Sequence, residues 1–212
     1  MTVETLKQQA ASQPVAGNGR VGRTRDAIIA SAFALAAAGE VAPIVRDVAK
    51  MAGVSARTVF QHFSDTAELY VAVLARMFAG LFADVPELGM ALPLEARLAL
   101  VVDQDANRYE QLLPMWAFIG MLQRRSTTAA DMMVQLYTTN HASLSRWFER
   151  ELAGLSAEAR ERTLNALALA LAPESWVMLR QRLGLTVDQA RDELCFVVNA
   201  LLTGPAGPAN RR

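Results

Sequence analysis

Apolar residues in this chain recur mainly at intervals of three and four positions, which is the period of an amphipathic α-helix. Leu69, Val73, Met77 and Leu81 form one such series. The same period predicts further helices over residues 23–39, 94–113, 115–125, 128–152, 157–183 and 187–202. Pro173 is expected to kink or split the helix over 157–183. Since no segment alternates apolar and polar residues long enough to indicate a strand, the predicted fold class is all-α.

Two short helices joined by a tight turn are predicted between Val45 and Val59, in the run VRDVAKMAGVSARTV. Ala49 is small enough for the helices to approach closely, Gly53 can take the left-handed conformation of a sharp corner, and Ser55 can cap the second helix. The second helix carries an apolar stripe that we expect to pack into the core, formed by Ala56, Val59, Phe60 and Phe63. This pattern is typical of a DNA-binding helix-turn-helix.

Polar side chains occupy the other face of the second helix, at Arg57, Thr58, Gln61 and His62. In a helix-turn-helix this face enters the major groove and contacts base edges. The alternative is an ordinary solvated surface. The agreement of turn, cap and apolar stripe within one short window favours DNA binding.

The residues around this window resemble a known family. The run AGVSARTVFQHFSDTAELY, residues 52–70, is similar to the signature of the tetracycline repressor (TetR) family of bacterial regulators, and residues 23–39 resemble its first helix, which would end at Gly39. The resemblance implies a helix-turn-helix domain over residues 23–66 and a helical effector-binding and dimerisation domain over residues 67–204. We expect DNA contacts from Arg46, Ser55, Ala56, Arg57, Thr58, Gln61, His62 and Thr66.

Three departures from the family pattern bear on DNA binding. Phe60 stands where tyrosine is usual, Thr66 stands where lysine is usual, and Pro43 and Ile44 replace the hydroxyl-bearing cap of the helix that contains Arg46. Each usual group can contact a DNA phosphate. Thr66 keeps a hydroxyl at a helix start, whose positive end attracts phosphate. The family implies a homodimeric repressor that an effector releases from its operator; the alternative is a helical ligand- or partner-binding protein of the same fold with weakened DNA binding.

Charge gives the chain no overall attraction to nucleic acid. Its 21 lysine and arginine residues balance 21 aspartate and glutamate residues. Between Arg20 and Thr66, basic residues exceed acidic ones only slightly. Specific binding must therefore depend on base contacts and helix termini more than on bulk charge.

Several other classes of protein are disfavoured. No apolar run reaches the roughly 18 residues that span a bilayer, and Glu4 stands where a secretory signal would have an apolar block. The single cysteine, Cys195, excludes an internal disulfide and suits a reducing cytoplasm. His62 and His141 lack clustered partners, and no spacing joins a nucleophile to a base. We therefore predict no metal, no cofactor and no enzyme active site.

Both ends of the chain are predicted to be flexible, over residues 1–22 and 205–212. We expect the first segment to be a disordered tail without contacts. The alternative is an arm that enters a minor groove, with Arg20, Arg23 and Arg25 at its end.

The middle helices should enclose the effector if the resemblance extends to the second domain. We expect its pocket to be lined by Val102, Asp105, Tyr109, Met115, Trp116, Met133, Tyr137, Asn140 and Leu144. The amide of Asn140 lies on an apolar stripe and needs a partner, which is either a ligand or a backbone carbonyl or water. Asp105 faces the ligand or pairs with Arg108, three residues on. Such a pocket suits a flat or apolar molecule with a few polar anchors.

The last two predicted helices carry apolar stripes with small alanines between the leucines. In the family these helices pair with their copies in a second subunit, and the resemblance implies the same four-helix bundle here. The expected interface residues are Leu164, Leu167, Leu171, Leu194, Val197, Val198 and Leu201. An internal stripe has the same period and is the alternative. A two-fold operator requires a dimer, which favours the interface.

Overall fold

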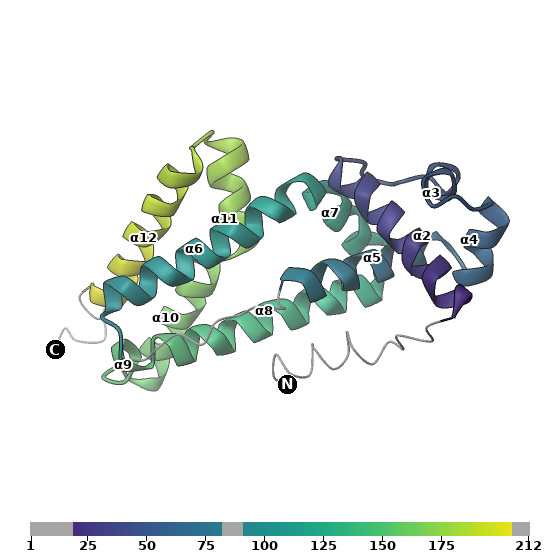
Figure 1. The fold of residues 1–212 in the computed structure, drawn as a ribbon. Coiled ribbons are helices and arrows are strands. Elements are labelled where there is room, and N and C mark those ends of the chain that lie inside the picture. Colours follow the sequence, from purple (N-terminus) through teal and green to yellow (C-terminus); the bar gives the residue numbers. More distant parts are fainter. Residues whose placement is uncertain (1–18, 82–90, 205–212) are drawn as a thin grey trace. The chain divides into compact units, whose positions relative to one another are not determined.

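The computed structural model describes residues 19–81 and 91–204, and helices account for most of them (Figure 1). These two segments contain no strand, so the all-α prediction is confirmed. Apart from its last four residues, the predicted arm over 1–22 lies outside the described residues, as does the tail over 205–212. Contacts divide the chain into two compact units, and the predicted domain boundary after residue 66 stays a prediction.

Unit 1 is built around its first described helix, α2, which contacts α3, α4, α5 and η1. The core side chains Ile28, Ala32, Val48, Val59 and Val73 are at most 1% exposed, and burying each large one contributes about 1.5–3 kcal/mol. Unit 1 comprises α2 (Arg20–Ala37), α3 (Val45–Met51), α4 (Ala56–His62), α5 (Thr66–Leu81), the 3₁₀ turn η1 (Leu113–Met115), α7 (Trp116–Arg125) and the first part of α8 (Thr127–Trp147).

The end of α2 was predicted correctly from the sequence, but its start was not. The helix begins at Arg20, three residues before the predicted start, because Gly19 takes the extended conformation of an N-cap. Gly39 follows the end of the helix with a φ of 96°, a left-handed conformation that glycine adopts without strain, so the predicted stop is confirmed. Arg20 is therefore a helical residue and not part of an extended arm.

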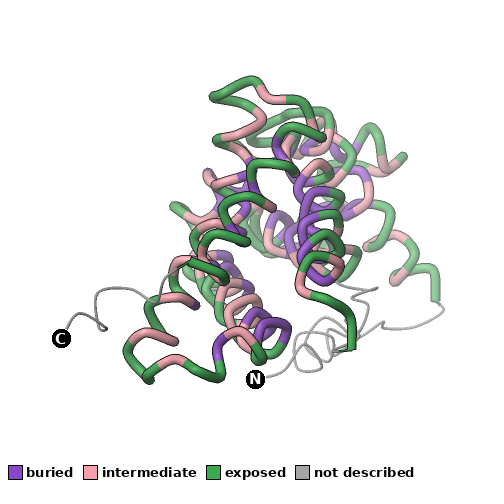
Figure 2. Tube along the Cα trace, turned by 90° about the vertical axis from the view of Figure 1, so that its left-hand side faces the viewer, coloured by how far each residue is buried: buried purple, intermediate pink, exposed green. Residues whose placement is uncertain are grey.

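Unit 2 is organised around α6, whose polar side chains bind several other elements. The hydroxyl of Tyr109 donates to the carbonyl of Leu171 at 2.7 Å, and Glu110 accepts hydrogen bonds from Trp176 Nε1 at 2.8 Å and Arg180 Nε at 2.7 Å. Unit 2 comprises α6 (Leu94–Leu112), the rest of α8, α9 (Glu149–Leu152), α10 (Ala157–Ala170), α11 (Pro173–Val177), the π-helical η2 (Met178–Arg182) and α12 (Val187–Thr203). Figure 2 shows that buried residues, in purple, recur between exposed residues, in green, along the helices.

Two long predicted helices are interrupted in the structure. The helix over 128–152 breaks at Phe148, whose side chain is fully buried. The helix over 157–183 is split at Pro173, which occupies the first turn of α11 with Ala172 as its N-cap. Proline fits there because its missing N–H would have no partner in a first turn. No helix within the described residues is long and apolar enough to cross a membrane.

Candidate nucleic-acid interface

The turn between α3 and α4 has the geometry that the sequence predicts. Gly53 has a φ of 66°, and the backbone N–H of Val54 donates to the carbonyl of Ala49 at 3.0 Å. Ala49 is buried where α3 contacts its neighbours. The turn thus fixes α4 at an angle to α3 that leaves one side of α4 exposed.

The start of α4 is closed by its cap. The Ser55 hydroxyl accepts the backbone N–H of Thr58 at 3.0 Å and lies 2.8 Å from the Thr58 hydroxyl. Both predictions for this residue, the cap and its position at the helix start, are confirmed. A cap of this kind contributes about 1 kcal/mol.

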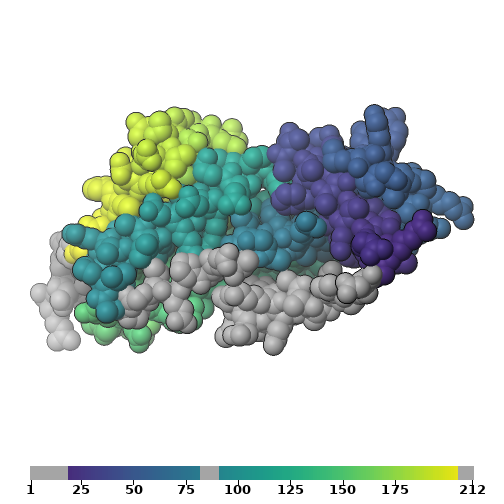
Figure 3. Space-filling view, in the orientation of Figure 1, coloured from purple at the N-terminus to yellow at the C-terminus, as the bar shows by residue number. Residues whose placement is uncertain are grey.

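The outward face of α4 carries free polar groups. Arg57 and Gln61 are exposed, one turn apart, and Thr58 and His62 are half-buried beside them. No hydrogen bond or ion pair joins Arg57 to any residue in the described segments, so its guanidinium is available to a ligand. Figure 3 shows α3 and α4, in blue, at the surface of unit 1.

The prediction that Phe60 packs into the core is wrong. Its side chain is 52% exposed, and Ala56 is exposed one turn before it. Val59 and Phe63, which are both 1% exposed, fill the inner side of this seven-residue helix without them. The Arg25 guanidinium stacks on the ring of Phe63, 4.8 Å from the ring centre. Phe60 is therefore a large apolar side chain on the surface that presents Arg57.

The starts of α3 and α5 differ in their caps. Asp65 accepts the backbone N–H of Glu68 at 2.8 Å, and Glu68 in turn accepts the N–H of Ser64 at 2.6 Å, which lowers the pKa of Glu68. Ile44, the N-cap of α3, has no side-chain hydrogen bond and is 49% exposed. Arg46 extends from the first turn of α3 into solvent, 3.4 Å from Asp47.

Comparison with known proteins agrees with this geometry. The family model "Bacterial regulatory proteins, tetR family" matches residues 28–73, which include the turn, the cap and the exposed face of α4. The helix-turn-helix is therefore of the TetR type. Its fold is similar to the crystal structure of a transcriptional regulator from Rhodococcus sp. Rha1, with 22% identity, a TM-score of 0.68, and coverage of 85% of this chain and 96% of that one. No curated protein matches the chain.

Most of the predicted dimer-interface residues are buried within the single chain. Within a single chain α10 packs against α12, and five of the predicted interface residues at these helices are at most 4% exposed. They are Leu164, Leu167, Leu171, Leu194 and Val198. Their burial within one chain fits the alternative to a dimer interface, an internal apolar stripe, which has the same period. The large apolar residues exposed on the same helices are Leu169, at 73%, and Phe196, at 71%; Val197 and Leu201 are partly exposed.

The predicted effector residues of the regulator are divided between the units. Met115, Trp116 and Met133 belong to unit 1, and the others belong to unit 2. The predicted residues in unit 2 include apolar, hydroxyl, amide and carboxyl side chains; they are Val102, Asp105, Tyr109, Tyr137, Asn140 and Leu144.

Asp105 makes the ion pair that the sequence offered as an alternative. Its Oδ1 lies 3.2 Å from Arg108 Nη1, and its Oδ2 is buried with no hydrogen-bond partner among the described residues. Burial raises the pKa of Asp105 to about 7, against the opposing effect of Arg108. Tyr137, on α8, donates a short hydrogen bond to Glu174. Asp105 therefore offers one unused acceptor oxygen inside unit 2.

The raised pKa of Asp105 predicts a pH dependence. A carboxyl that binds its proton more tightly in the folded protein than in the unfolded chain stabilises the fold fully below about pH 4 and loses this contribution as the pH rises through about 7. We expect the unfolding free energy of the natural protein to fall, relative to an Asp105→Asn variant, between pH 4 and pH 7. Denaturant unfolding at several pH values measures this difference. A constant difference would contradict the raised pKa.

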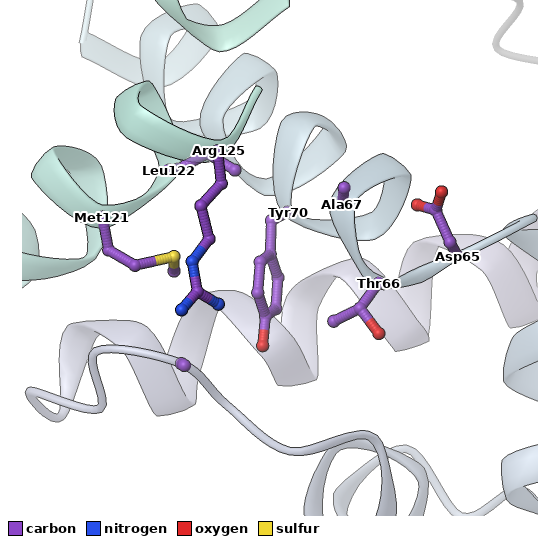
Figure 4. A pocket seen from close by; sticks show the side chains of 8 residues that line it. Asp65, Thr66, Ala67, Tyr70, Met121, Leu122 and Arg125 are labelled. Carbon is purple, nitrogen blue, oxygen red and sulfur yellow. The ribbon is translucent and has the colours of Figure 1, made fainter. Parts of the chain in front are cut away.

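The described residues hold no group of three or more His, Cys, Asp or Glu side chains arranged to bind a metal ion. The family model that matches residues 28–73 describes regulatory proteins. Arg125 lies beside the start of α5 (Figure 4), and no motif in the sequence marks it as a functional residue. No local pattern could have found it, because α7 and α5 are far apart in the sequence.

Proposed function

We propose that this regulator binds double-stranded operator DNA as a homodimer and represses transcription until a small apolar or aromatic effector releases it. The observation that carries the proposal is the exposed face of α4, where Arg57 and Gln61 stand free, one turn apart, on a helix fixed by the Gly53 turn. In a helix-turn-helix this face enters the major groove.

The side chains of α4 have distinct roles in this proposal. Arg57 donates two hydrogen bonds to a guanine edge, and Gln61 makes a two-point contact with adenine. Ser55, Thr58 and His62 contact the adjacent sugar-phosphate backbone. The DNA contacts are completed by Ala56, Arg46 and Thr66.

Phe60 contacts the 5-methyl group of thymine in this proposal, since apolar side chains favour that group in the major groove. Replacing the contacted thymine with uracil removes one methyl group and should weaken binding about fourfold, from about 0.8 kcal/mol of lost burial. Operators with single uracil substitutions, compared by gel shift, measure the effect.

The matched controls are Phe60→Ala, which should bind the thymine and uracil operators equally, and Phe60→Tyr, which keeps the ring and should still distinguish them. If the natural protein binds every uracil operator as tightly as the thymine operator, Phe60 does not contact a thymine methyl group.

The dimer that we propose places two copies of α4 in successive major grooves, about 34 Å apart. Its interface uses the apolar side chains of α10 and α12 that the chain leaves exposed. These are Leu169, Phe196, Val197 and Leu201.

The effector that we propose binds within unit 2. Val102 and Leu144 supply apolar surface there, and Asp105, Tyr109, Tyr137 and Asn140 supply polar anchors. Effector binding lowers operator affinity by favouring a conformation in which the separation of the two α4 helices no longer fits the operator. The size of the effect is limited by the difference between the effector's affinities for the two conformations.

Footprinting on genomic DNA tests the proposed function most directly, followed by gel shifts against the recovered sites. We expect protection of two half-sites related by two-fold symmetry, and no protection with a double variant Arg57→Ala, Gln61→Ala. Absence of any protected site for the natural protein would favour the alternative, a ligand- or partner-binding protein that keeps this fold.

A further inference from the structure

A hollow of about 500 Å³ lies in unit 1 beside the start of α5. Three segments that are distant in the sequence line it (Figure 4). Ala42 comes from the loop between α2 and α3, Asp65 to Ala67 and Tyr70 come from the start of α5, and Met121, Leu122 and Arg125 come from the end of α7. None of the contacts described for α4 involves this hollow.

Arg125 is the cation among the residues that line the hollow. Its side chain is exposed and forms no salt bridge with any residue in segments 19–81 and 91–204. In Figure 4 the guanidinium of Arg125, the hydroxyl of Tyr70 and the side chain of Thr66 point to the same side of α5. The carboxylate of Asp65 points away from them and is already bonded to the N–H of Glu68. An anion entering the hollow thus meets a free guanidinium.

Tyr70 holds the three lining segments in place. Its hydroxyl donates to the carbonyl of Pro43 at 2.6 Å, and this bond is buried. Its ring packs edge-on against Phe118 of α7, with the ring centres 5.2 Å apart. The loop before α3, the first turns of α5 and the helix that carries Arg125 are therefore fixed relative to one another.

The hollow borders the two helix starts that a helix-turn-helix brings to the DNA backbone. The first helix of the motif crosses the backbone, and Pro43 directly precedes Ile44, the N-cap of that helix. Thr66, on the other side, opens α5 without the lysine that would supply a positive charge. Ala42, two residues before the N-cap of α3, and Thr66, the first residue of α5, both line the hollow, so a DNA strand bound across these two helix starts would lie near it.

We propose that Arg125 binds a phosphate of the DNA backbone at this hollow and supplies the positive charge that residue 66 lacks. This inference rests on the proposed DNA-binding function. A guanidinium suits the role because its planar N–H groups can bind two phosphate oxygens at once and it stays charged at every physiological pH. The contact adds affinity to all DNA sequences alike and carries no preference for particular bases.

The test compares binding of the full chain to operator and random duplexes over a salt series from 50 to 200 mM. Each phosphate contact adds about 0.9 to the slope of log affinity against log salt. Arg125→Gln should therefore reduce the change in affinity over this range about threefold per subunit, equally for both duplexes. Arg124→Gln is the matched control, since Arg124 is exposed in the same turn but does not line the hollow.

Two further variants separate charge from structure. Arg125→Lys keeps the charge and should keep most of the slope. Adding Thr66→Lys to Arg125→Gln should restore the slope, because the new amine stands on the opposite side of the same hollow. In the natural protein, Thr66→Lys alone should steepen the slope by about one phosphate per subunit.

An unchanged slope for Arg125→Gln, in a natural protein that does bind its operator, would overturn the proposal, and so would a loss confined to the operator. A melting temperature that inorganic phosphate raises in the natural protein but not in Arg125→Gln, with no change in DNA binding, would assign the hollow to a free anion instead. If the natural protein binds no operator, the proposed function fails before this inference is reached.

Discussion

Replacing Arg57 with alanine should lower the affinity of the regulator for its operator by about 1 to 3 kcal/mol, or about 5- to 150-fold. Arg57 lies on the exposed face of α4 with no partner among the described residues, so the substitution disturbs no contact within the folded chain. The loss should come from two hydrogen bonds to one guanine. Affinities for operators substituted at each position, measured with both proteins, should show relaxed preference at one position per half-site.

Gln61→Ala serves as the matched comparison for Arg57→Ala. It should relax preference at a different position, where the operator carries adenine. If Arg57→Ala weakens binding to operator and random DNA equally, Arg57 contacts a phosphate and does not determine specificity.

The helix-turn-helix could be predicted from sequence because local chemistry determines it. The positive φ at Gly53, the cap at Ser55 and the buried side chain of Val59 each depend on residues within a few positions. Phe60 was misplaced for a different reason. Period alone assigns a residue to a face of a helix but does not say how wide a face the neighbouring helix covers, and here Val59 and Phe63 complete the buried side.

In unit 2 the features that could not be predicted from the sequence depend on tertiary contacts. The apolar stripes of α10 and α12 have the same period whether they pack against each other or against a second chain, and the structure buries Leu164 and Val198 within one chain. The break between α8 and α9 at Phe148 could not be predicted, because no glycine or proline stands at this position. The split of the helix predicted over 157–183 could be predicted, because Pro173 causes it. Proline is favoured in the first turn of a helix, and Pro173 occupies the first turn of α11.

The hollow beside α5 also depends on tertiary contacts and could not be predicted from the sequence. Pro43, Tyr70 and Arg125 come from three separate segments, and only the folded chain brings them together. The sequence has Thr66 at a position where the family usually has lysine. It could not show that an arginine from α7 lies nearby.

The double variant Leu169→Glu, Phe196→Glu should be monomeric and should lose operator affinity by about 10² to 10⁴-fold, because two linked half-site contacts become two independent ones. Both side chains are more than 70% exposed in the single chain, on α10 and α12. Carboxylates there cost little in the monomer but would have to lose their hydration at a dimer interface. Analytical ultracentrifugation measures the oligomeric state, and gel shifts measure the affinity.

Two comparisons make this result specific to the interface. Leu100→Glu places a charge at another exposed apolar position, on α6, and should leave the dimer intact. Val198→Glu places a charge at a fully buried position between α10 and α12, and should lower the melting temperature before it affects assembly. A stable dimer of the Leu169→Glu, Phe196→Glu variant, with unchanged operator binding, would show that the two copies meet through another surface.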